Sequence, residues 1–475
     1  MLAQATMIDR MLASDPDYNG VFITAVKTTG IYCLPSCHAR KPKPENVEFF
    51  TTPDLARQAG YRACKQCRPD DFYNGINPEE TLIENVVAAM YADPAQFGEV
   101  QAVANAANVG VTKLFELMRI HYHGTPADML MKARIEAAQH ALLNSTSAIT
   151  TIAHEVGFES LSAFNANFRQ LSALSPSEFR KLSQQTHFSL TLPSDYQHER
   201  ILAQLGRDPR SLTARVDGHV WTSSVRLNEH DGAIVQVKFD QNHAECEVVH
   251  GLDLDSAAMH TIYRHVMLSL GLTCDPQRFE AHVAKSPELA PLVAGKHGLR
   301  IPLVSDVYDG ITWAIIGQQI NLPFAFTLRQ RLIERFGTPL ADGLYLAPTA
   351  ATVAQLHEED LTPLQFSRSK ASYLIGISQA IVDGRLPLAT FNRASFSKIE
   401  RMLLAQRGIG AWSAHYVLMR ALGFADCVPV GDTGLTSGLQ QFFQLEQRPD
   451  RATTLALMAA FSPFRSLATF HFWQR

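Results

Sequence analysis

Two closely spaced cysteine pairs near the start of the chain constrain its fold most strongly. Three residues separate Cys33 from Cys37, two separate Cys64 from Cys67, and 26 residues lie between the pairs. Four thiolates at this spacing can converge on one ion, and four sulfur ligands suit tetrahedral Zn²⁺. The pattern therefore predicts a small zinc-held α/β module in which all four cysteines bind the metal.

Positive charge surrounds these cysteines, which is typical of a protein face that meets phosphate. The basic residues are Lys27, Arg40, Lys41, Lys43, Arg57, Arg62, Lys65 and Arg68. Two interpretations stay open at this point. The zinc site is either a closed structural site, as most four-cysteine sites are, or it holds a nucleophile, because zinc keeps a thiol ionised at neutral pH.

Length and composition indicate a multidomain globular protein. A chain of 475 residues exceeds what one hydrophobic core usually organises. Its net charge of -4 argues against non-specific coating of nucleic acid but allows local DNA-binding faces. The first residues do not resemble a secretory signal, and no apolar run is long enough to span a bilayer. Because the remaining cysteines (Cys246, Cys274 and Cys427) lie far apart, we expect a reducing, cytoplasmic location without membrane contact.

Changes in residue pattern predict a multidomain α+β fold with four parts. The first, residues 1–76, contains a strand-like alternation over 21–26 and ends in a loop that begins near Asp70. Apolar residues at helical spacing then dominate an all-α part, and apolar–polar alternation predicts antiparallel strands over 187–253. Helical patterns return from Ser256 to the end, with Pro/Gly loops between them. The remaining domain boundaries are 79–183, 187–295 (β-rich) and 296–475 (all-α).

Two helix-turn-helix candidates lie in the all-α part, over residues 103–119 and 149–169. A turn between two short helices lets the second helix project into a major groove. A plain helical bundle with glycine turns is the alternative. Between residues 79 and 183, seven Lys/Arg face eleven Asp/Glu, so this part is expected to bind DNA weakly alone.

A second candidate site lies in the last part of the chain. Gly408 and Gly410 separate two helical segments, and such a hairpin exposes backbone N–H groups that can hold a DNA phosphate. Asp432 follows in a loop rich in glycine and proline. Taken singly, the hairpin reads as an ordinary turn and Asp432 as a helix cap.

The cysteine motifs resemble the zinc domain of the Ada family of adaptive-response proteins. The resemblance rests on residues 28–37 and 60–70 and covers nearly all of 15–75. It implies that Cys33 accepts a methyl group irreversibly from a methylated DNA phosphotriester, while Cys37, Cys64 and Cys67 remain ligands of one structural and activating Zn²⁺. Methylation would remove negative charge beside the DNA backbone, so DNA affinity should rise.

Residues 171–180, with an earlier echo at 123–126, resemble the AraC family of DNA-binding domains. The hairpin together with Asp432 resembles the helix-hairpin-helix DNA glycosylases, in particular AlkA, over 187–475. This resemblance implies that Asp432 is the catalytic carboxylate and that the alkylated base is flipped into an aromatic pocket. It assigns Trp412, Tyr416 and Trp473 to that pocket, and Gly408, Gly410, Gln318 and Gln319 to the DNA backbone and to the wedge in the base stack.

Two departures refine the expectation. Glycosylases that also cleave the backbone carry a lysine where this chain has Trp412, which favours a monofunctional DNA-3-methyladenine glycosylase. Gln319 stands where the family can use leucine, so this chain departs from the family pattern at the wedge. The Pro-Cys-His-Arg sequence of the Ada base-methyl acceptor does not occur.

The sequence thus predicts a DNA alkylation repair protein that also regulates transcription. Its expected partners are alkylated double-stranded DNA, promoter DNA and, for an activator, RNA polymerase. The alternative is a methylation-responsive transcription factor whose glycosylase-like half is catalytically silent.

Overall fold

The computed structural model describes residues 2–15, 18–75, 77–251 and 254–474. The chain divides into two compact units, Met1–Asn85 and Val86–Arg475. Within the described residues, no helix combines the length and the apolar character needed to cross a membrane. The fold class predicted from the sequence is confirmed in both units.

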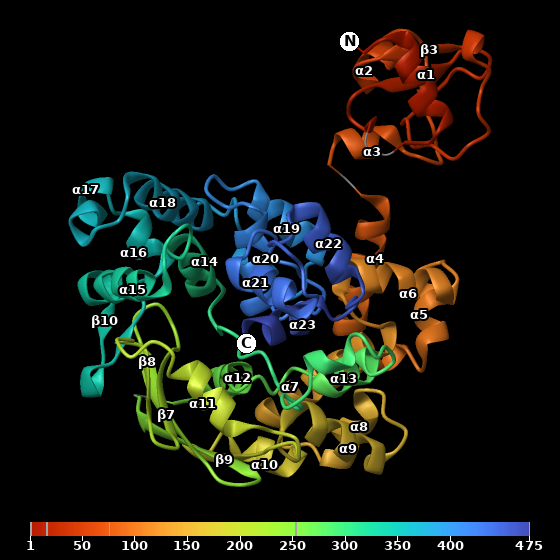
Figure 1. Ribbon diagram of the computed structural model, residues 1–475. Helices are drawn as coiled ribbons and strands as arrows, with labels where there is room; N and C mark the ends of the chain where they lie inside the picture. Colours follow the sequence, from red (N-terminus) through yellow and green to blue (C-terminus); the bar gives the residue numbers. More distant parts are fainter. Residues whose placement is uncertain (1, 16–17, 76, 252–253, 475) are drawn as a thin grey trace. The chain divides into compact units, whose positions relative to one another are not determined.

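The N-terminal unit (Figure 1) is built on a four-stranded sheet, whose strand order is β3-β1-β2-β4. The strands are β1 (Ile23–Val26), β2 (Ile31–Cys33), β3 (Val47–Phe50) and β4 (Arg62–Ala63). Strand β1 pairs antiparallel with β2 and β3, whereas β2 and β4 run parallel. The helices of this unit are α1 (Gln4–Leu12), α2 (Pro53–Gln58) and α3 (Pro69–Tyr73).

Helix α3 corrects the loop predicted around Asp70. Arg68 adopts a left-handed backbone conformation, and Pro69 then occupies the first helical turn, where its missing N–H costs nothing. Asp70 and Asp71 follow in that first turn, where carboxylates are favourable. Residues that read as loop formers therefore start a short helix after the last cysteine.

The helical segment after the N-terminal unit contains both predicted helix-turn-helix pairs. The first pair is α5 (Val100–Ala106) and α6 (Val111–Tyr122), and the second is α8 (Ile149–Glu155) and α9 (Leu161–Ser172). Helix α7 (Pro126–Asn144) joins the pairs, α4 (Pro78–Ala92) precedes them, and α10 (Pro176–Lys181) follows. Capping boxes start α7 at Thr125 and α10 at Ser175.

A five-stranded antiparallel sheet follows, with strand order β5-β9-β8-β7-β6. Its strands are β5 (His187–Thr191), β6 (Ala214–Asp217), β7 (Val220–Arg226), β8 (Gly232–Phe239) and β9 (His243–His250). The prediction of strands throughout 187–253 was wrong for α11 (His198–Leu205). That helix buries Ile201 and Leu202. Helix α12 (Ser256–Ser269) then packs on the sheet, and α13 (Pro276–Val283) follows it.

The second helix-turn-helix pair and this sheet share one hydrophobic core. Phe164, Phe168 and Phe179 belong to the same cluster of buried side chains as Trp221 of β7 and Tyr263 of α12. The Phe179 and Tyr263 rings meet edge to face at 5.0 Å, and the Tyr263 hydroxyl donates to the Ser172 carbonyl. The AraC-like segment and the sheet are therefore packed as one body.

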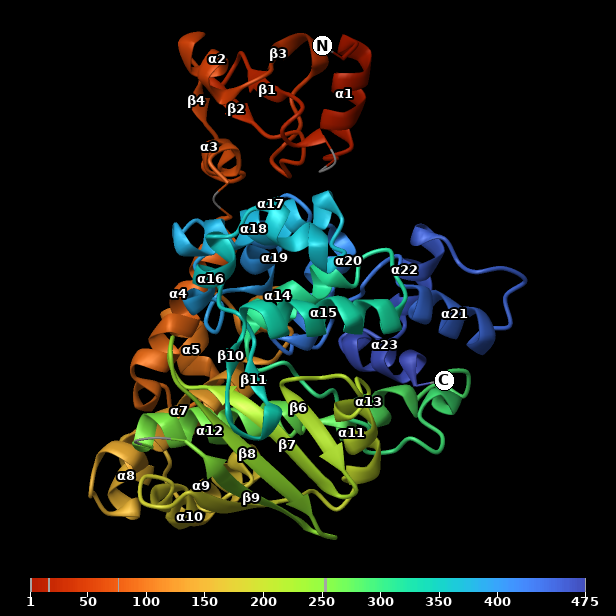
Figure 2. The same ribbon diagram turned by 90° about the vertical axis from the view of Figure 1, so that its left-hand side faces the viewer.

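The rest of the chain is a helical domain around the largest apolar core, confirming the prediction of helices after Ser256 (Figure 2). Its main helices are α14 (Val307–Ile316), α15 (Leu322–Phe336), α16 (Ala350–Ala354), α17 (Glu358–Leu361), α18 (Arg368–Val382), α19 (Phe396–Leu404), α20 (Ala411–Arg420), α21 (Thr433–Phe442), α22 (Arg451–Ala459) and α23 (Arg465–Trp473). Two short strands, β10 (Thr338–Pro339) and β11 (Tyr345–Leu346), form a hairpin where the sequence predicted a loop.

Candidate functional site

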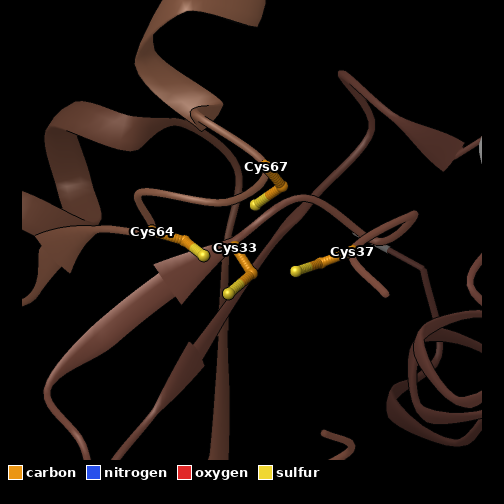
Figure 3. A group of neighbouring side chains, drawn as sticks. All are labelled: Cys33, Cys37, Cys64 and Cys67. Atoms are coloured by element: carbon orange, nitrogen blue, oxygen red, sulfur yellow. The ribbon is translucent and has the colours of Figure 1, made fainter. Parts of the chain in front are cut away.

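The four N-terminal cysteines meet at one point of the first unit. Cys33 ends β2, Cys37 follows it by one turn, and Cys64 and Cys67 flank the turn between β4 and α3. All four sulfurs lie within 4.8 Å of one another, and Figure 3 shows them pointing toward a common centre. A regular ZnS₄ tetrahedron with Zn–S bonds of about 2.3 Å has S···S edges of about 3.8 Å. The group therefore fits one tetrahedral zinc ion after a small contraction.

The pKa shifts of these thiols are also consistent with a bound cation. Hydrogen bonds from Cys33 and Cys67 lower the pKa of Cys37 to about 2, while the shared hydrogen bonds raise the pKa of Cys33. So many sulfurs at this separation cannot all ionise without a compensating positive charge. Zn²⁺ supplies that charge and takes thiolates as ligands.

The surroundings of the four sulfurs differ. Cys37 and Cys64 are buried, with 6% and 8% of their surface exposed, whereas Cys33 and Cys67 are half-buried. The Leu34 N–H donates to the Cys67 sulfur at 3.4 Å. Within the described residues, no backbone N–H donates to the Cys33 sulfur. Of the two half-buried sulfurs, only that of Cys67 accepts a hydrogen bond from a backbone N–H in the described residues, so Cys33 is the more available nucleophile.

Most of the positive charge near the cysteines lacks a carboxylate partner in the described part of the chain. Lys27, Arg57 and Arg68 form ion pairs with acidic neighbours. The other five basic residues make no ion pair there: Arg40, Lys41, Lys43, Arg62 and Lys65. This module therefore retains a basic surface suited to a DNA backbone.

Removing the metal is expected to unfold the N-terminal unit and leave the second unit folded. The first unit buries a small apolar cluster, formed by Ile23, Ala25, Tyr32, Leu34 and Ala56. Structural zinc in such small modules contributes roughly 10–16 kcal/mol. Limited proteolysis after treatment with a strong chelator should therefore cut within residues 18–75 first. Protection of that region in the metal-free chain would show that zinc does not hold the module together.

The glycine hairpin lies between α19 and α20, as the sequence predicted. Gly408 has φ +91°, and a Cβ atom there would lie 2.2 Å from the Tyr373 ring of α18. Ile409 is buried beneath the turn, and Gly410 caps the N-terminus of α20. Close packing on Tyr373 and a left-handed backbone therefore both require glycine at 408.

Gly408→Ala is expected to destabilise the second unit by roughly 2–4 kcal/mol, combining the left-handed conformation with the overlap on Tyr373. Gly376→Ala provides a matched control, because Gly376 lies exposed on the same helix as Tyr373 with open space around its Cα. That control should stabilise the unit slightly, since alanine favours helix. Thermal denaturation of both variants measures the difference; equal midpoints would contradict the close packing.

Asp432 lies at the centre of a cluster of aromatic residues. Its carboxylate accepts hydrogen bonds from Trp412 Nε1 at 3.0 Å and from Trp473 Nε1 at 2.8 Å. The Leu435 N–H also donates to it at 2.8 Å, so Asp432 caps α21. The Tyr416 ring stacks on Trp412 at 5.4 Å and lies 6.1 Å from Trp473. The structure thus brings the predicted carboxylate and the three predicted pocket aromatics together.

The two glutamines between α14 and α15 are placed differently from each other. Gln319 is exposed at the tip of the turn, with φ +56°. Gln318 instead turns inward, and its amide donates to the Gly408 carbonyl at 2.7 Å and to Ser413 Oγ at 2.9 Å. Gln319 is therefore exposed to solvent, while Gln318 ties this turn to the hairpin.

The sequence analysis missed Lys370, which binds the turn between α14 and α15. Its Nζ donates to the carbonyls of Ile316 and Gln318 at the end of α14, and burial lowers its pKa to about 8. The indole–carboxylate hydrogen bonds of Asp432 were missed as well. The Lys370 contacts and the hydrogen bonds of Asp432 join segments that meet only in the folded chain, so no local sequence pattern predicts them.

Comparisons with known proteins agree with this arrangement. Four family descriptions match the chain in order: the metal binding domain of Ada (residues 6–70), a helix-turn-helix domain (103–182), the AlkA N-terminal domain (189–306) and the HhH-GPD superfamily of base excision DNA repair proteins (312–463).

Individual relatives cover the whole chain or a part of it. A Mycobacterium tuberculosis protein named "Probable bifunctional transcriptional activator/DNA repair enzyme AlkA" is 28% identical, covering 97% of this chain and 94% of its own length. The Bacillus subtilis protein YfjP, whose name assigns it to the DNA-3-methyladenine glycosylases, is 31% identical over 60% of this chain and 97% of its own length. A solved structure of 3-methyladenine DNA-glycosylase from Archaeoglobus fulgidus has a TM-score of 0.53 and 21% identity, covering 60% of this chain and 97% of that one.

Proposed function

Because the chain belongs to the family of DNA-3-methyladenine glycosylases of the AlkA type, with an Ada-type metal-binding domain ahead of them, we propose that it repairs alkylated DNA at two sites. One site hydrolyses the N-glycosidic bond of alkylated bases such as 3-methyladenine. The observation that carries this proposal is the Asp432 carboxylate, held by two indole N–H groups beside stacked aromatic rings.

The aromatic cluster suits a cationic, flipped base. An alkylated purine carries positive charge, and the faces of tryptophan and tyrosine rings attract cations. Trp412 and Tyr416 come from α20 and Trp473 from α23, so the helical core fixes their spacing. A pocket of this kind selects bases by charge and shape, with little need for specific hydrogen bonds.

Asp432 acts on the sugar. As the bond between C1′ and the base breaks, its electron pair leaves with the base, which becomes neutral. The carboxylate stabilises the positive charge that develops on the sugar, and water adds to C1′ with loss of a proton. Trp412 occupies the hairpin position where a lyase would carry its lysine, so we propose a monofunctional hydrolase that leaves an intact abasic strand.

The second site is the cysteine cluster, where a single Zn²⁺ would keep all four sulfurs as thiolates. The Cys33 sulfur attacks the methyl carbon of a methylphosphotriester; an S–C bond forms, the C–O bond breaks, and the phosphodiester leaves with the electron pair. Its half-buried position and the lack of a backbone donor among the described residues support Cys33 as this nucleophile.

Methylation also supplies a switch. The zinc centre loses one negative charge, so its repulsion of DNA falls, while the five basic residues that make no ion pair in the described part of the chain remain. We propose that the methylated form binds promoter DNA through helices α6 and α9, and that RNA polymerase responds to that complex.

The deciding experiment for the repair activity measures bases released from methylated double-stranded DNA. Chromatography should show free 3-methyladenine, and the DNA strand should break only after alkali. Strand cleavage without alkali would contradict the hydrolase, and the lack of released base would leave the regulator as the remaining function.

A further inference from the structure

The loop that carries Asp432 is clamped where it enters the site. Three successive backbone N–H groups, those of Asp426, Cys427 and Val428, each donate to a side-chain acceptor. The acceptor for Cys427 is Ser466 Oγ of α23, and the acceptor for Val428 is His415 Nδ1 of α20, both at 3.0 Å. These two acceptors belong to the glycosylase domain itself.

The third acceptor comes from the helix-turn-helix segment. His123 directly follows α6, the second helix of the first pair, and its Nδ1 accepts from the Asp426 N–H at 3.0 Å. A backbone N–H can only donate, so Nδ1 carries no proton and the imidazole is neutral. Burial agrees with this, because it lowers the pKa of His123 to about 4.

Packing fixes the His123 ring in this place. Its backbone is left-handed, with φ 52°, where the chain leaves α6. The ring lies 4.2 Å from the Phe396 ring of α19 and 5.5 Å from that of Phe424, measured between centroids. Phe396 and Phe424 also contact each other at 5.4 Å. An aromatic slot in the glycosylase domain thus receives a histidine from the regulatory segment.

Neighbouring contacts tie the same two segments together. His121 Nδ1 and Ser397 Oγ lie 2.9 Å apart, and the Tyr122 hydroxyl donates to the Arg393 carbonyl at 3.2 Å. Farther along, Arg278 binds both carboxylate oxygens of Asp128 at 2.8 Å. The end of α6 is therefore docked on α19, the first helix of the glycine hairpin.

We propose that His123 is a positioning residue for base excision, so that the helix-turn-helix segment is a working part of the glycosylase site. This inference rests on the proposed glycosylase function. Loss of the His123 acceptor leaves the Asp426 N–H buried without its partner and loosens the chain six residues before Asp432. Misplacement of a reacting group by about 1 Å can lower a rate roughly a hundred-fold.

Two substitutions separate the hydrogen bond from the ring packing. His123→Phe keeps an aromatic ring in the slot and removes the acceptor. His123→Asn removes the ring but places Oδ1 near the position of Nδ1, and asparagine accepts the left-handed backbone readily. Glu136→Gln is the interface control, because it breaks only the exposed ion pair between Glu136 and Arg393.

The full chain carrying each substitution is tested by single-turnover base release and by hydrogen exchange of the peptide spanning 425–432. We expect His123→Phe to slow base release by roughly ten- to a hundred-fold, with unchanged DNA affinity and faster exchange in that peptide. His123→Asn and Glu136→Gln should remain within about three-fold of the unaltered chain.

The proposal would be overturned if His123→Phe released base and exchanged hydrogen at the same rates as the unaltered chain. It would also be overturned if His123→Asn lost as much base-release rate as His123→Phe, because the effect would then come from ring packing. If His123→Phe does not fold, judged by exchange in α14, His123→Ala paired with His123→Asn makes the same comparison. If the unaltered chain releases no base, the glycosylase function fails, while exchange at 425–432 still decides whether His123 holds the loop.

Discussion

Asp432→Asn is expected to reduce the release of 3-methyladenine by roughly a thousand-fold or more, because the charge that stabilises the sugar cation is lost. The fold should survive, since asparagine caps helices as well as aspartate does. Its Oδ1 can still accept from Leu435 N and Trp473 Nε1. Its amide hydrogens, however, face the Trp412 indole N–H, so that hydrogen bond is lost as well.

Asp450→Asn is the matched control for this substitution. Asp450 caps α22 through a hydrogen bond from the Thr453 N–H at 2.8 Å, just as Asp432 caps α21, but it is exposed and distant in sequence from the aromatic cluster. Both variants should show similar thermal midpoints, while only Asp432→Asn loses base release. Undiminished release by Asp432→Asn would remove Asp432 from the mechanism.

Cys33→His is expected to abolish methyl transfer while the chain retains zinc. Histidine nitrogen can replace a thiolate as a zinc ligand, but it does not supply the sulfur that attacks the methyl group. After incubation with methylphosphotriester DNA, mass spectrometry should show one methyl group on the Cys33 peptide of the unaltered chain and none on any cysteine of Cys33→His.

Cys67→His provides the comparison, because Cys67 is the other half-buried ligand. This variant also loses one thiolate and keeps four ligands, so its zinc content should match that of Cys33→His. Methylation at Cys33 should persist in it. A methyl group found on Cys67 in the unaltered chain would identify Cys67 as the nucleophile. Cys33 would then be only a structural zinc ligand.

The parts of both sites that follow from short spacings were predictable from the sequence. The cysteine pairs, the hairpin glycines and the two helix-turn-helix pairs each depend on residues that lie within one or two turns of one another. Predictions from neighbouring residues were wrong where two local tendencies oppose each other. Asp70 and Asp71 suggested a loop, yet behind Pro69 they start α3, and α11 interrupts a segment whose average pattern is that of strands.

The remaining features depend on contacts between distant segments. Trp473 meets Asp432 across 41 residues, Lys370 reaches the Ile316 carbonyl across 54, and His123 meets Asp426 across 303. Each of these residues looks unremarkable in its local sequence. Only the packing of the core decides that an indole, an ammonium group and an imidazole become hydrogen-bonding partners of the Asp432 loop and of the turn after α14.

The hydrophobic core shared by the AraC-like helices and the five-stranded sheet has a consequence for how such a chimera can evolve. Sequence similarity divides the chain near residue 185, but severing it there would bare Phe164, Phe168 and Phe179 on one fragment and Tyr263 on the other. A fragment that begins near residue 185 would expose the Tyr263 side of this core to water, so it is expected to aggregate more readily than the full chain. A deletion that separates the two parts therefore needs polar substitutions on the uncovered face, which constrains how the chain can evolve.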